Sequence, residues 1–477
     1  MPPRETHTAM KRIITAALLA QALVQPNVWA AATDTLAIAE ATNATSRLLR
    51  PLSLADALDI ALQQNSAIRK SQADLEAMHG VVVQTRAIAL PKVGIHSSYS
   101  ANEESATDRF RLKTNNPAFN LDRLIEFADQ RWSADIRVTQ SVYEGGRINS
   151  ALRTARLTRE QALLNHQTVI ADVLRDVRVA YYDVLLAQQQ IIVREASTAL
   201  LQKELTDTQQ RFEAGTVPKF NVLRAEVEVA NARPKLIRAR NAFRMAKDNF
   251  ANLLGESVAR ETQELMLQLI DKLDTRPLDL PLSTALAKAL EQRTELAALR
   301  KVEALRDESV TSAKAGYKPS VQIFGGYGAR SSQFSSDLTD ELHGWEAGAQ
   351  LSWPIFDGFL TKGRVREAEA LRSRVREELA DAERKVELDV RTAYSFFTEA
   401  QEVLRSQEKV QESAEEALRL ATARAAAGTA TQLDVLNAQT ALTEARTTQV
   451  QALHDYAVAK ARLERAMGQG ISNDKRQ

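Results

Sequence analysis

The same sequence pattern occurs twice in this chain, at a constant offset of 213 residues. Asp176–Tyr181 (DVRVAY) returns as Asp389–Tyr394 (DVRTAY), and the segment RFEAGT that begins at Arg211 returns as RAAAGT at Arg424. The register holds without a gap from Glu144 to Gly255 in the first copy. A repeat of this length indicates a duplicated structural unit, so the fold must accommodate two similar halves.

Each copy contains a very long helical segment. Residues 147–214 and 364–427 contain neither glycine nor proline, and a helix of that length would extend roughly 100 Å. Apolar residues at alternating steps of four and three predict a coiled-coil seam on each segment. The seam residues are Val173, Val177, Ala180, Val184, Ala187 and Ile191 in the first copy and Val386, Val390, Ala393, Phe397, Ala400 and Leu404 in the second.

Glycines predict where these helices turn back. Gly215 and Gly428 follow the outgoing helices, and the return helices run to Gly255 and Gly468, because glycine readily adopts the left-handed conformation that ends a helix. Pro234 lies inside the first return helix and is expected to kink it or loosen one turn. Each copy therefore contains a helical hairpin.

Two regions of alternating apolar and polar residues precede the hairpins. Residues 91–145 and 319–358 predict β-hairpins, each with one apolar and one polar face. Trp132, Trp345 and Trp353 lie on the apolar faces. Strands of about ten residues with aromatic residues at the borders are typical of membrane barrels, while a soluble sandwich with one face in water is the alternative.

The pattern divides the chain into segments. The expected order is a signal peptide at 1–30, an extended segment at 31–51, a first repeat at 52–255, a linker at 256–281, a second repeat at 282–468 and a tail at 469–477. In each repeat a helix, a β-hairpin (91–145 or 319–358) and a helical hairpin (146–255 or 359–468) follow one another. The initial helices are expected to run from Leu52 and Leu282 to Pro91 and Pro319, with Ser53 as a cap.

The N-terminus and the composition point to a compartment outside the cytoplasm. Lys11 and Arg12 precede an apolar run at 13–24 and a small-x-small site at 28–30, the pattern of a secretory signal peptide. The chain has no cysteine, which excludes disulfides, thiolate metal sites and a lipid-anchored N-terminal cysteine. No other segment has the apolar length of a membrane helix, so any entry into a membrane is expected to use β-strands.

Enzyme and nucleic-acid functions find no support in the residues. The 62 basic and 61 acidic residues balance, so no net charge favours nucleic acid. The six histidines are scattered, and neither an HExxH nor a phosphate-binding GxxxxGK[ST] motif occurs. We therefore expect no enzyme activity, no cofactor and no metal site.

Four strands per chain cannot close a membrane barrel, because the smallest such barrels have eight and an open sheet edge is not tolerated in lipid. At least two chains must then share one barrel, and three are expected. Three chains would also place six helical hairpins around a common axis. A ring of that size is expected to be hollow, which favours a duct.

The order of these motifs resembles the TolC family of outer-membrane efflux and secretion proteins over residues 50–468. The resemblance is carried by SWPIFDG at 352–358, by QSVYEGGR at 140–147 and by the repeated turns at Gly215 and Gly428. It implies a mainly α fold with a shared 12-stranded trimeric β-barrel in the outer membrane. It also implies an α-helical tunnel through the periplasm and docking to a periplasmic adaptor and an inner-membrane ABC or proton-driven transporter.

The resemblance also implies two kinds of site. Asp434 matches an acidic residue at the family's constriction, with Asn437 where a second aspartate is common and Asn221 at the equivalent place in the first copy. The alternative is that Asp434 only stabilises a helix N-terminus. The adaptor is expected to dock on small and basic residues at the two hairpin turns, which are Arg211, Ala214, Gly215, Arg424, Ala427 and Gly428. These residues could instead only cap and propagate the helices.

The sequence thus predicts the exit duct of a tripartite export system. The missing N-terminal cysteine favours type I protein secretion over the lipoprotein ducts of drug pumps. A multidrug efflux duct remains the first alternative, and a periplasmic coiled-coil adaptor is the alternative from another class.

Overall fold

The computed structural model describes residues 51–103, 109–110, 125–126, 128–255, 268–273, 278–333 and 337–469. The expected signal peptide, residues 31–50 and the tail from 470 lie outside the described residues. The chain divides into two compact units, residues 1–53 with 256–271 and residues 54–255 with 272–477. In the first unit, Leu52 forms a parallel bridge with Leu269.

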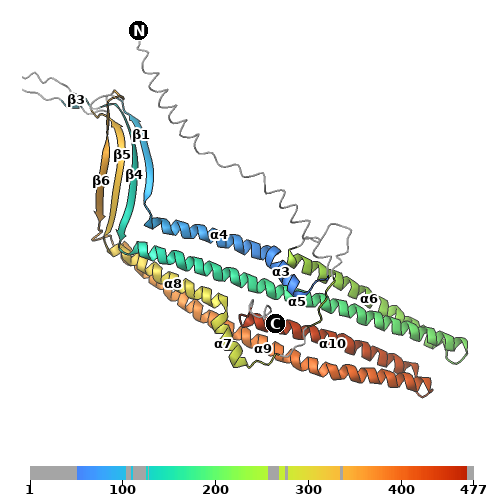
Figure 1. Ribbon diagram of the computed structural model, residues 1–477. Coiled ribbons are helices and arrows are strands. Elements are labelled where there is room, and N and C mark those ends of the chain that lie inside the picture. The colour runs from blue at the N-terminus through green and yellow to red at the C-terminus, as the bar shows by residue number, and fades with distance from the viewer. Residues whose placement is uncertain are drawn as a thin grey trace, which may run out of the picture. The chain divides into compact units, whose positions relative to one another are not determined.

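The second unit contains two successions of helices and strands in the same order (Figure 1). The first succession consists of α3 (Leu54–Gln64), α4 (Ser66–Arg86), η1 (Ala87–Ala89), β1 (Lys92–Ala101), β4 (Gln130–Glu144), α5 (Arg147–Glu213) and α6 (Lys219–Leu254). The second consists of α7 (Leu282–Gln292), α8 (Thr294–Lys314), η3 (Ala315–Tyr317), β5 (Ser320–Ser331), β6 (Glu341–Ser352), α9 (Leu360–Ala426) and α10 (Gln432–Ala466). Between β1 and β4, the short strands β2 (Arg109–Phe110) and β3 (Ile125–Glu126) pair with each other.

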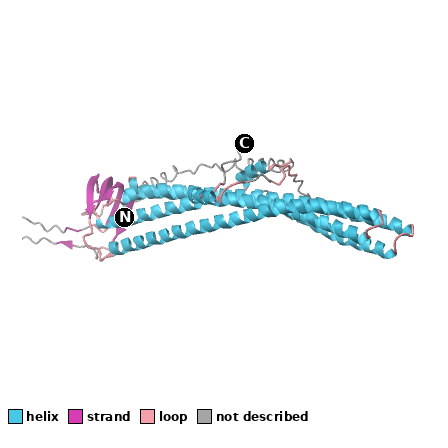
Figure 2. Cartoon of the chain, turned by 90° about the horizontal axis from the view of Figure 1, so that it is seen from below, coloured by secondary structure: helices cyan, strands magenta, loops and turns pink. Residues whose placement is uncertain are grey.

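The predicted long helices are confirmed. Helices α5 and α9 each contain 67 residues, and they pair lengthwise with α6 and α10; Figure 2 shows the helices running side by side. Helix α6 continues through Pro234. None of the helices among the described residues combines the length and the hydrophobicity that a membrane span requires.

The helices predicted between Leu52 and Pro91 and between Leu282 and Pro319 are wrong in one respect, because each is two helices. Asn65 leaves the helical conformation, and its Oδ1 accepts hydrogen bonds from the N–H groups of Ala67 and Ile68, so it caps a new helix. The break packs against the end of α6, where a Cβ on Gly255 would lie 2.4 Å from the carbonyl oxygen of Gln64. Close packing between a helix break and a return helix therefore requires glycine there.

The second break repeats this arrangement. Arg293 interrupts α7 and α8 with an extended backbone, and its Nε donates to the carbonyl oxygen of Ala466 at the end of α10. A Cβ on Gly468 would lie 2.9 Å from the carbonyl carbon of Gln292. A helix break therefore packs against the end of the return helix in both halves. The Asn65 side chain caps the following helix, whereas the Arg293 side chain makes no such cap and binds only the end of α10.

The predicted coiled-coil seams form the core of the hairpins. Ten of the twelve seam residues are buried, and Ile191 and Ala393 are half-buried. Aromatic pairs reinforce both seams, with Tyr181 against Phe250 at 5.8 Å and Phe397 against Tyr456 at 5.4 Å between ring centroids.

The four long strands form one antiparallel sheet in the order β1-β4-β5-β6. The two predicted hairpins, β1–β4 and β5–β6, are confirmed and are joined through β4 and β5. The register between β4 and β5 shifts between Ser141 and Tyr143, as a β-bulge does. In Figure 1 the sheet lies at the end of α5 and α9 where these helices begin, away from the hairpin turns.

Candidate functional site

One face of the sheet is apolar across all four strands. Directly paired residues point to the same face, and the register pairs Tyr99 with Trp132, Ile136 with Tyr327, and Tyr327 with Trp345. Trp345 is 79% exposed. An apolar surface of this extent requires a covering partner or a membrane.

Two of the three tryptophans predicted at the borders of this face, Trp132 and Trp353, are held by backbone acceptors. The indole N–H of Trp132 donates to the carbonyl oxygen of Leu338 at 3.0 Å, and that of Trp353 donates to the carbonyl oxygen of Tyr317 at 3.2 Å. Both rings present their apolar surfaces while the indole N–H is satisfied, which suits a boundary between water and an apolar phase.

The opposite face of the sheet carries a charge network that sequence reasoning did not identify. Arg137 pairs with Glu346 and lies 4.0 Å from Asp135, and its guanidinium carbon lies 5.5 Å from the ring centroid of Phe324. Nδ1 of His96 lies 3.8 Å from the same carboxylate oxygen, Oδ2 of Asp135. The alternation of residue types predicted a polar face, but only the strand register shows which charges meet.

The two hairpin turns share one hydrogen-bond pattern. Gly215 and Gly428 have φ angles of 75° and 74°, and the N–H groups of Thr216 and Thr429 donate to the carbonyl oxygens of Arg211 and Arg424 at 2.9 Å. The hydroxyls of the two threonines donate to the same carbonyl oxygens. The repeated Arg-x-x-Ala-Gly-Thr motif therefore encodes a helix C-cap.

All six residues predicted at the turns are exposed: Arg211, Ala214, Gly215, Arg424, Ala427 and Gly428. The C-cap uses only the backbone of the two arginines, so their side chains are not required for the turn.

Asp434 occupies the first turn of α10 and completes a capping box with Thr431. Hydrogen bonds from the backbone and side chain of Thr431 hold the pKa of the Asp434 carboxyl below its usual value. Asn221 has the equivalent position in α6, where Pro218 precedes the helix and supplies no side-chain cap. Asn437 is exposed one turn further along α10. Among the described residues, no hydrogen bond or ion pair joins Asp434, Asn437 and Asn221 to one another.

A row of polar pairs joins α5 to α10 along the seam between the two hairpins. From the turn towards the sheet the pairs are Thr208–Gln432 at 2.6 Å, Ser197–Thr443 at 3.1 Å, Asp183–His454 at 2.7 Å, Arg178–Glu464 at 2.9 Å and Asp172–Arg465 at 3.0 Å. Arg465 also pairs with Glu295 of α8, and its hydrogen bonds and charge help to hold the pKa of Glu295 low against the effect of burial. The seam is therefore fixed by specific polar contacts.

The corresponding residues of the other copy do not reproduce these pairs. At the 213-residue offset they are Ala421 and Lys219, Val410 and Ala230, Phe396 and Asn241, Arg391 and Ala251, and Lys385 and Asn252. None of them combines opposite charges. A position-by-position comparison of the two repeats could have found this asymmetry from the sequence.

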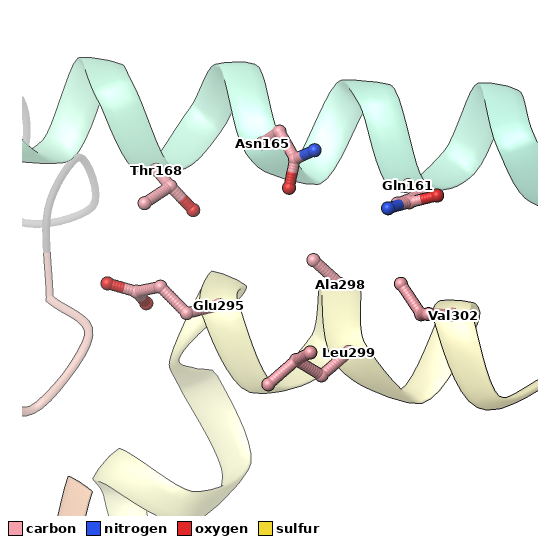
Figure 3. Close-up of a pocket in the computed structure, with 7 residues that line it drawn as sticks. All are labelled: Gln161, Asn165, Thr168, Glu295, Ala298, Leu299 and Val302. Carbon is pink, nitrogen blue, oxygen red and sulfur yellow. The ribbon is translucent and has the colours of Figure 1, made fainter. Parts of the chain in front are cut away.

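A cavity of about 320 Å³ lies between α5 and α8 (Figure 3). Gln161 and Asn165 of α5 face Ala298 and Val302 of α8 across it. No residue predicted for the constriction, the turns or the membrane borders lines this cavity.

Comparison with known proteins identifies the family. The family model described as outer membrane efflux protein matches residues 57–256 and 285–469. TolC of Vibrio cholerae is 25% identical over 426 residues, covering 87% of this chain and 90% of the relative. The alkaline protease secretion protein AprF of Pseudomonas aeruginosa is 26% identical over 414 residues, covering 86% of this chain and 83% of AprF.

A solved structure shows the same fold. The outer membrane protein VceC of Vibrio cholerae matches with a TM-score of 0.70 at 18% identity, covering 87% of this chain and 96% of VceC. Each range that the family model matches includes one pair of long strands and one helical hairpin. The resemblance inferred from the sequence and the expected outer-membrane location are thus confirmed. The chain belongs to the outer membrane efflux protein family, a family of outer-membrane channels and not of enzymes.

Proposed function

We propose that three copies of this chain form the outer-membrane exit duct of a tripartite export system. The sheet supplies the main support: its apolar face is continuous, and its outer strands β1 and β6 each have a partner on one side only within the described chain. In lipid, such edges must be paired. Three copies of the four-stranded sheet would give a twelve-stranded closed barrel, within the range of natural membrane barrels.

The repeat supports the same assembly through the helices. Helices α5 and α10 pack together within one chain, and the 213-residue offset makes α9 and α6 their counterparts. Within the chain α9 packs on α10, α8 and α7, while α6 packs on α5 and α3. Exposed apolar residues occupy the counterpart faces: Phe396, Val403 and Val410 on α9, and Ile237 and Met245 on α6. A neighbouring copy would cover them in the way that α5 and α10 cover each other.

The duct would continue from the outer membrane into the periplasm through the helical hairpins. Exposure of the two turns, with six small or basic residues in equivalent places, supports docking of a periplasmic adaptor there. At the same end, Asp434 of three copies would form a carboxylate ring that favours cations, with Asn437 and Asn221 beside it. Capping of α10 by Asp434 is compatible with this role, because one carboxylate oxygen, Oδ2, accepts both bonds from Thr431.

The cargo that we favour is protein exported by a type I system. Similarity to a protein named for alkaline protease secretion supports this choice. A drug or metal efflux duct is the alternative, since a cobalt-zinc-cadmium resistance protein of Cupriavidus metallidurans is 24% identical over 255 residues.

The partner identifies the pathway. Cross-linking in cells, followed by purification of the chain from the outer membrane, should recover heat-modifiable trimers together with an adaptor and an ABC transporter. Recovery of a proton-driven pump would replace protein secretion by the efflux alternative. A chain that fractionates without trimers and without any inner-membrane partner would contradict the duct.

A further inference from the structure

His454 lies in the seam between α5 and α10 and is 8% exposed. Its Nε2 lies 2.7 Å from Oδ1 of Asp183 on α5, and its Nδ1 lies 3.0 Å from Oδ1 of Asp455 on α10. A neutral imidazole has one N–H and can donate to only one of these carboxylates. Both contacts are hydrogen bonds only when the ring is protonated, so the geometry fits an imidazolium held between two anions.

The surroundings of the ring favour its charge. From α5 the charged group in contact with it is Asp183, and from α10 it is Asp455, whose Oδ1 also accepts from Nε2 of Gln451 at 2.8 Å. Helix α9 also packs against α10, through the aromatic contact between Phe397 and Tyr456. No charged side chain among the described residues of α9 contacts the imidazole of His454. Burial lowers the pKa of His454, but hydrogen bonds and charges of Asp183 and Asp455 outweigh burial and raise it.

The contact between Asp183 and His454 occurs in the seam between α5 and α10 and has no equivalent at the corresponding positions of α9 and α6. The 213-residue counterparts of Asp183 and His454 are Phe396 and Asn241, which cannot form an ion pair. In a trimer, the seam within each chain would carry the charged contact, and the seam between chains would not. Protonation would therefore act on the joint between the two hairpins of one chain and leave the joints between chains unchanged.

We propose that His454 is a proton-controlled clamp on the duct, which holds α5 against α10 while protonated and loosens this seam when it loses its proton. This inference rests on the trimeric duct proposed above and adds its regulation. Because the folded-state pKa is raised, the clamp is fully present below the ordinary histidine value of about 6.5. The clamp is lost as the pH rises through the higher pKa that His454 has in the folded protein. Acid closes the seam and alkali relaxes it.

Spin labels test this directly in the full-length trimer, since the chain has no cysteine of its own. Gln189→Cys on α5 and Thr448→Cys on α10 place labels on exposed positions next to the clamp, both on the side of the hairpin turns. The distance between labels, measured by pulsed electron paramagnetic resonance from pH 5.5 to 9.5, should increase or broaden with a midpoint above about 6.5. In a His454→Gln background it should not change with pH.

A matched control is His166→Gln, because His166 also accepts or donates one hydrogen bond, with Ser71, but joins α5 to α4. It should leave the titration unchanged. Should His454→Gln fail to assemble, Asp183→Asn serves instead and should also abolish the pH-dependent change in distance, because it removes the charged partner of His454 on α5. Two results in intact trimers would overturn the clamp but not the duct. The first is a label distance that does not change with pH, and the second is the same pH dependence in His454→Gln as in the parent chain. Absence of trimers in the parent chain would overturn the duct itself.

Discussion

Thr431 and Asp434 cap α10 reciprocally. The N–H of Asp434 donates to Oγ1 of Thr431 at 3.3 Å, and the N–H of Thr431 donates to Oδ2 of Asp434 at 2.8 Å. The residue proposed for the constriction is thus also the residue that fixes the start of its helix. A ring of three such carboxylates would be held at a defined height, because each is anchored to a helix end.

Replacing Asp434 by alanine should reduce cation selectivity and weaken block by multivalent cations, because the ring would lose its charge. The measurement is single-channel conductance of purified trimers in a salt gradient. Asp381→Ala is the control, since Asp381 also carries a carboxylate but lies on α9, where it pairs with Lys385. Unchanged selectivity and block in Asp434→Ala would eliminate the ring and leave Asp434 with its capping role alone.

The same carboxylate gives a pH dependence of opposite sign to that of His454. The pKa of Asp434 is lowered in the folded chain. Its contribution to helix capping is therefore present when the pH is above the pKa of the unfolded chain, and it is lost as the pH falls through the pKa of the folded chain. Hydrogen exchange of the first turn of α10 should therefore accelerate only in strong acid. Thr431→Val should remove this acid-dependent step, and retention of the step would show that another group controls it.

Substitution of Gly428 by tryptophan should abolish transport while trimers remain, because the bulky ring would stand on the surface proposed for adaptor docking. Gly428 has a left-handed backbone, so any side chain adds strain of about 1 kcal/mol or more. Gly428→Asn is the matched control, since asparagine tolerates this conformation. Normal export by the tryptophan variant, measured beside its trimer content, would argue against docking at this turn.

Glu204 provides a test of burial in the seam. Burial is the largest effect on the Glu204 carboxyl and raises its pKa in the folded chain. The stability that the protonated carboxyl provides is therefore present when the pH is below the pKa of the unfolded chain, and it is lost as the pH rises through the pKa of the folded chain. Glu204→Gln, which stays neutral, should raise thermal stability at pH 7 and make little difference near pH 4. Glu412→Gln on the exposed face of α9 should do neither. Equal melting temperatures of Glu204→Gln and the parent chain at pH 7 would contradict this reading of the seam.

Asn65→Ala should destabilise the joint between α3 and α4 by about 1–2 kcal/mol, the usual cost of losing a helix cap. Its side chain also donates to the carbonyl oxygen of Leu253 at 2.6 Å, so the end of α6 loses a contact as well. Denaturant unfolding measures the change, with the exposed Asn437→Ala as the reference. A loss no greater than that of the reference would show that the break at Asn65 does not depend on its cap.

The sequence predicted the parts of the fold that depend on periodicity. The long helices, their turns at Gly215 and Gly428 and the four strands follow from local rules that the chain satisfies twice. The break at Asn65 was missed although asparagine is a common helix cap, because the contact with the end of α6 that also fixes the break is tertiary. The turns give a second example. The sequence drew attention to the positive charges of Arg211 and Arg424, whereas the turns are formed by hydrogen bonds to the backbone carbonyl oxygens of these residues.

The candidate site was predicted only in outline. Alternation placed Trp132 and Trp345 on an apolar face, but the pairing of Arg137 with Glu346 required the register between strands distant in sequence. The contact between Asp183 and His454 joins residues 271 positions apart. Single residues on amphipathic helices do not indicate such pairs, because many polar residues share the same face.

The contact between copies tests the central claim most directly. Phe396→Cys and Asn241→Cys, combined in this cysteine-free chain, place thiols on α9 and α6 where the repeat predicts that neighbouring copies meet. Mild oxidation should give a closed, three-chain species on denaturing gels, and each single variant should give none. The in-chain counterpart pair, Asp183→Cys with His454→Cys, should cross-link without any increase in mass. A Phe396–Asn241 variant that stays at the mass of one chain while inserted in the outer membrane would contradict the trimeric duct.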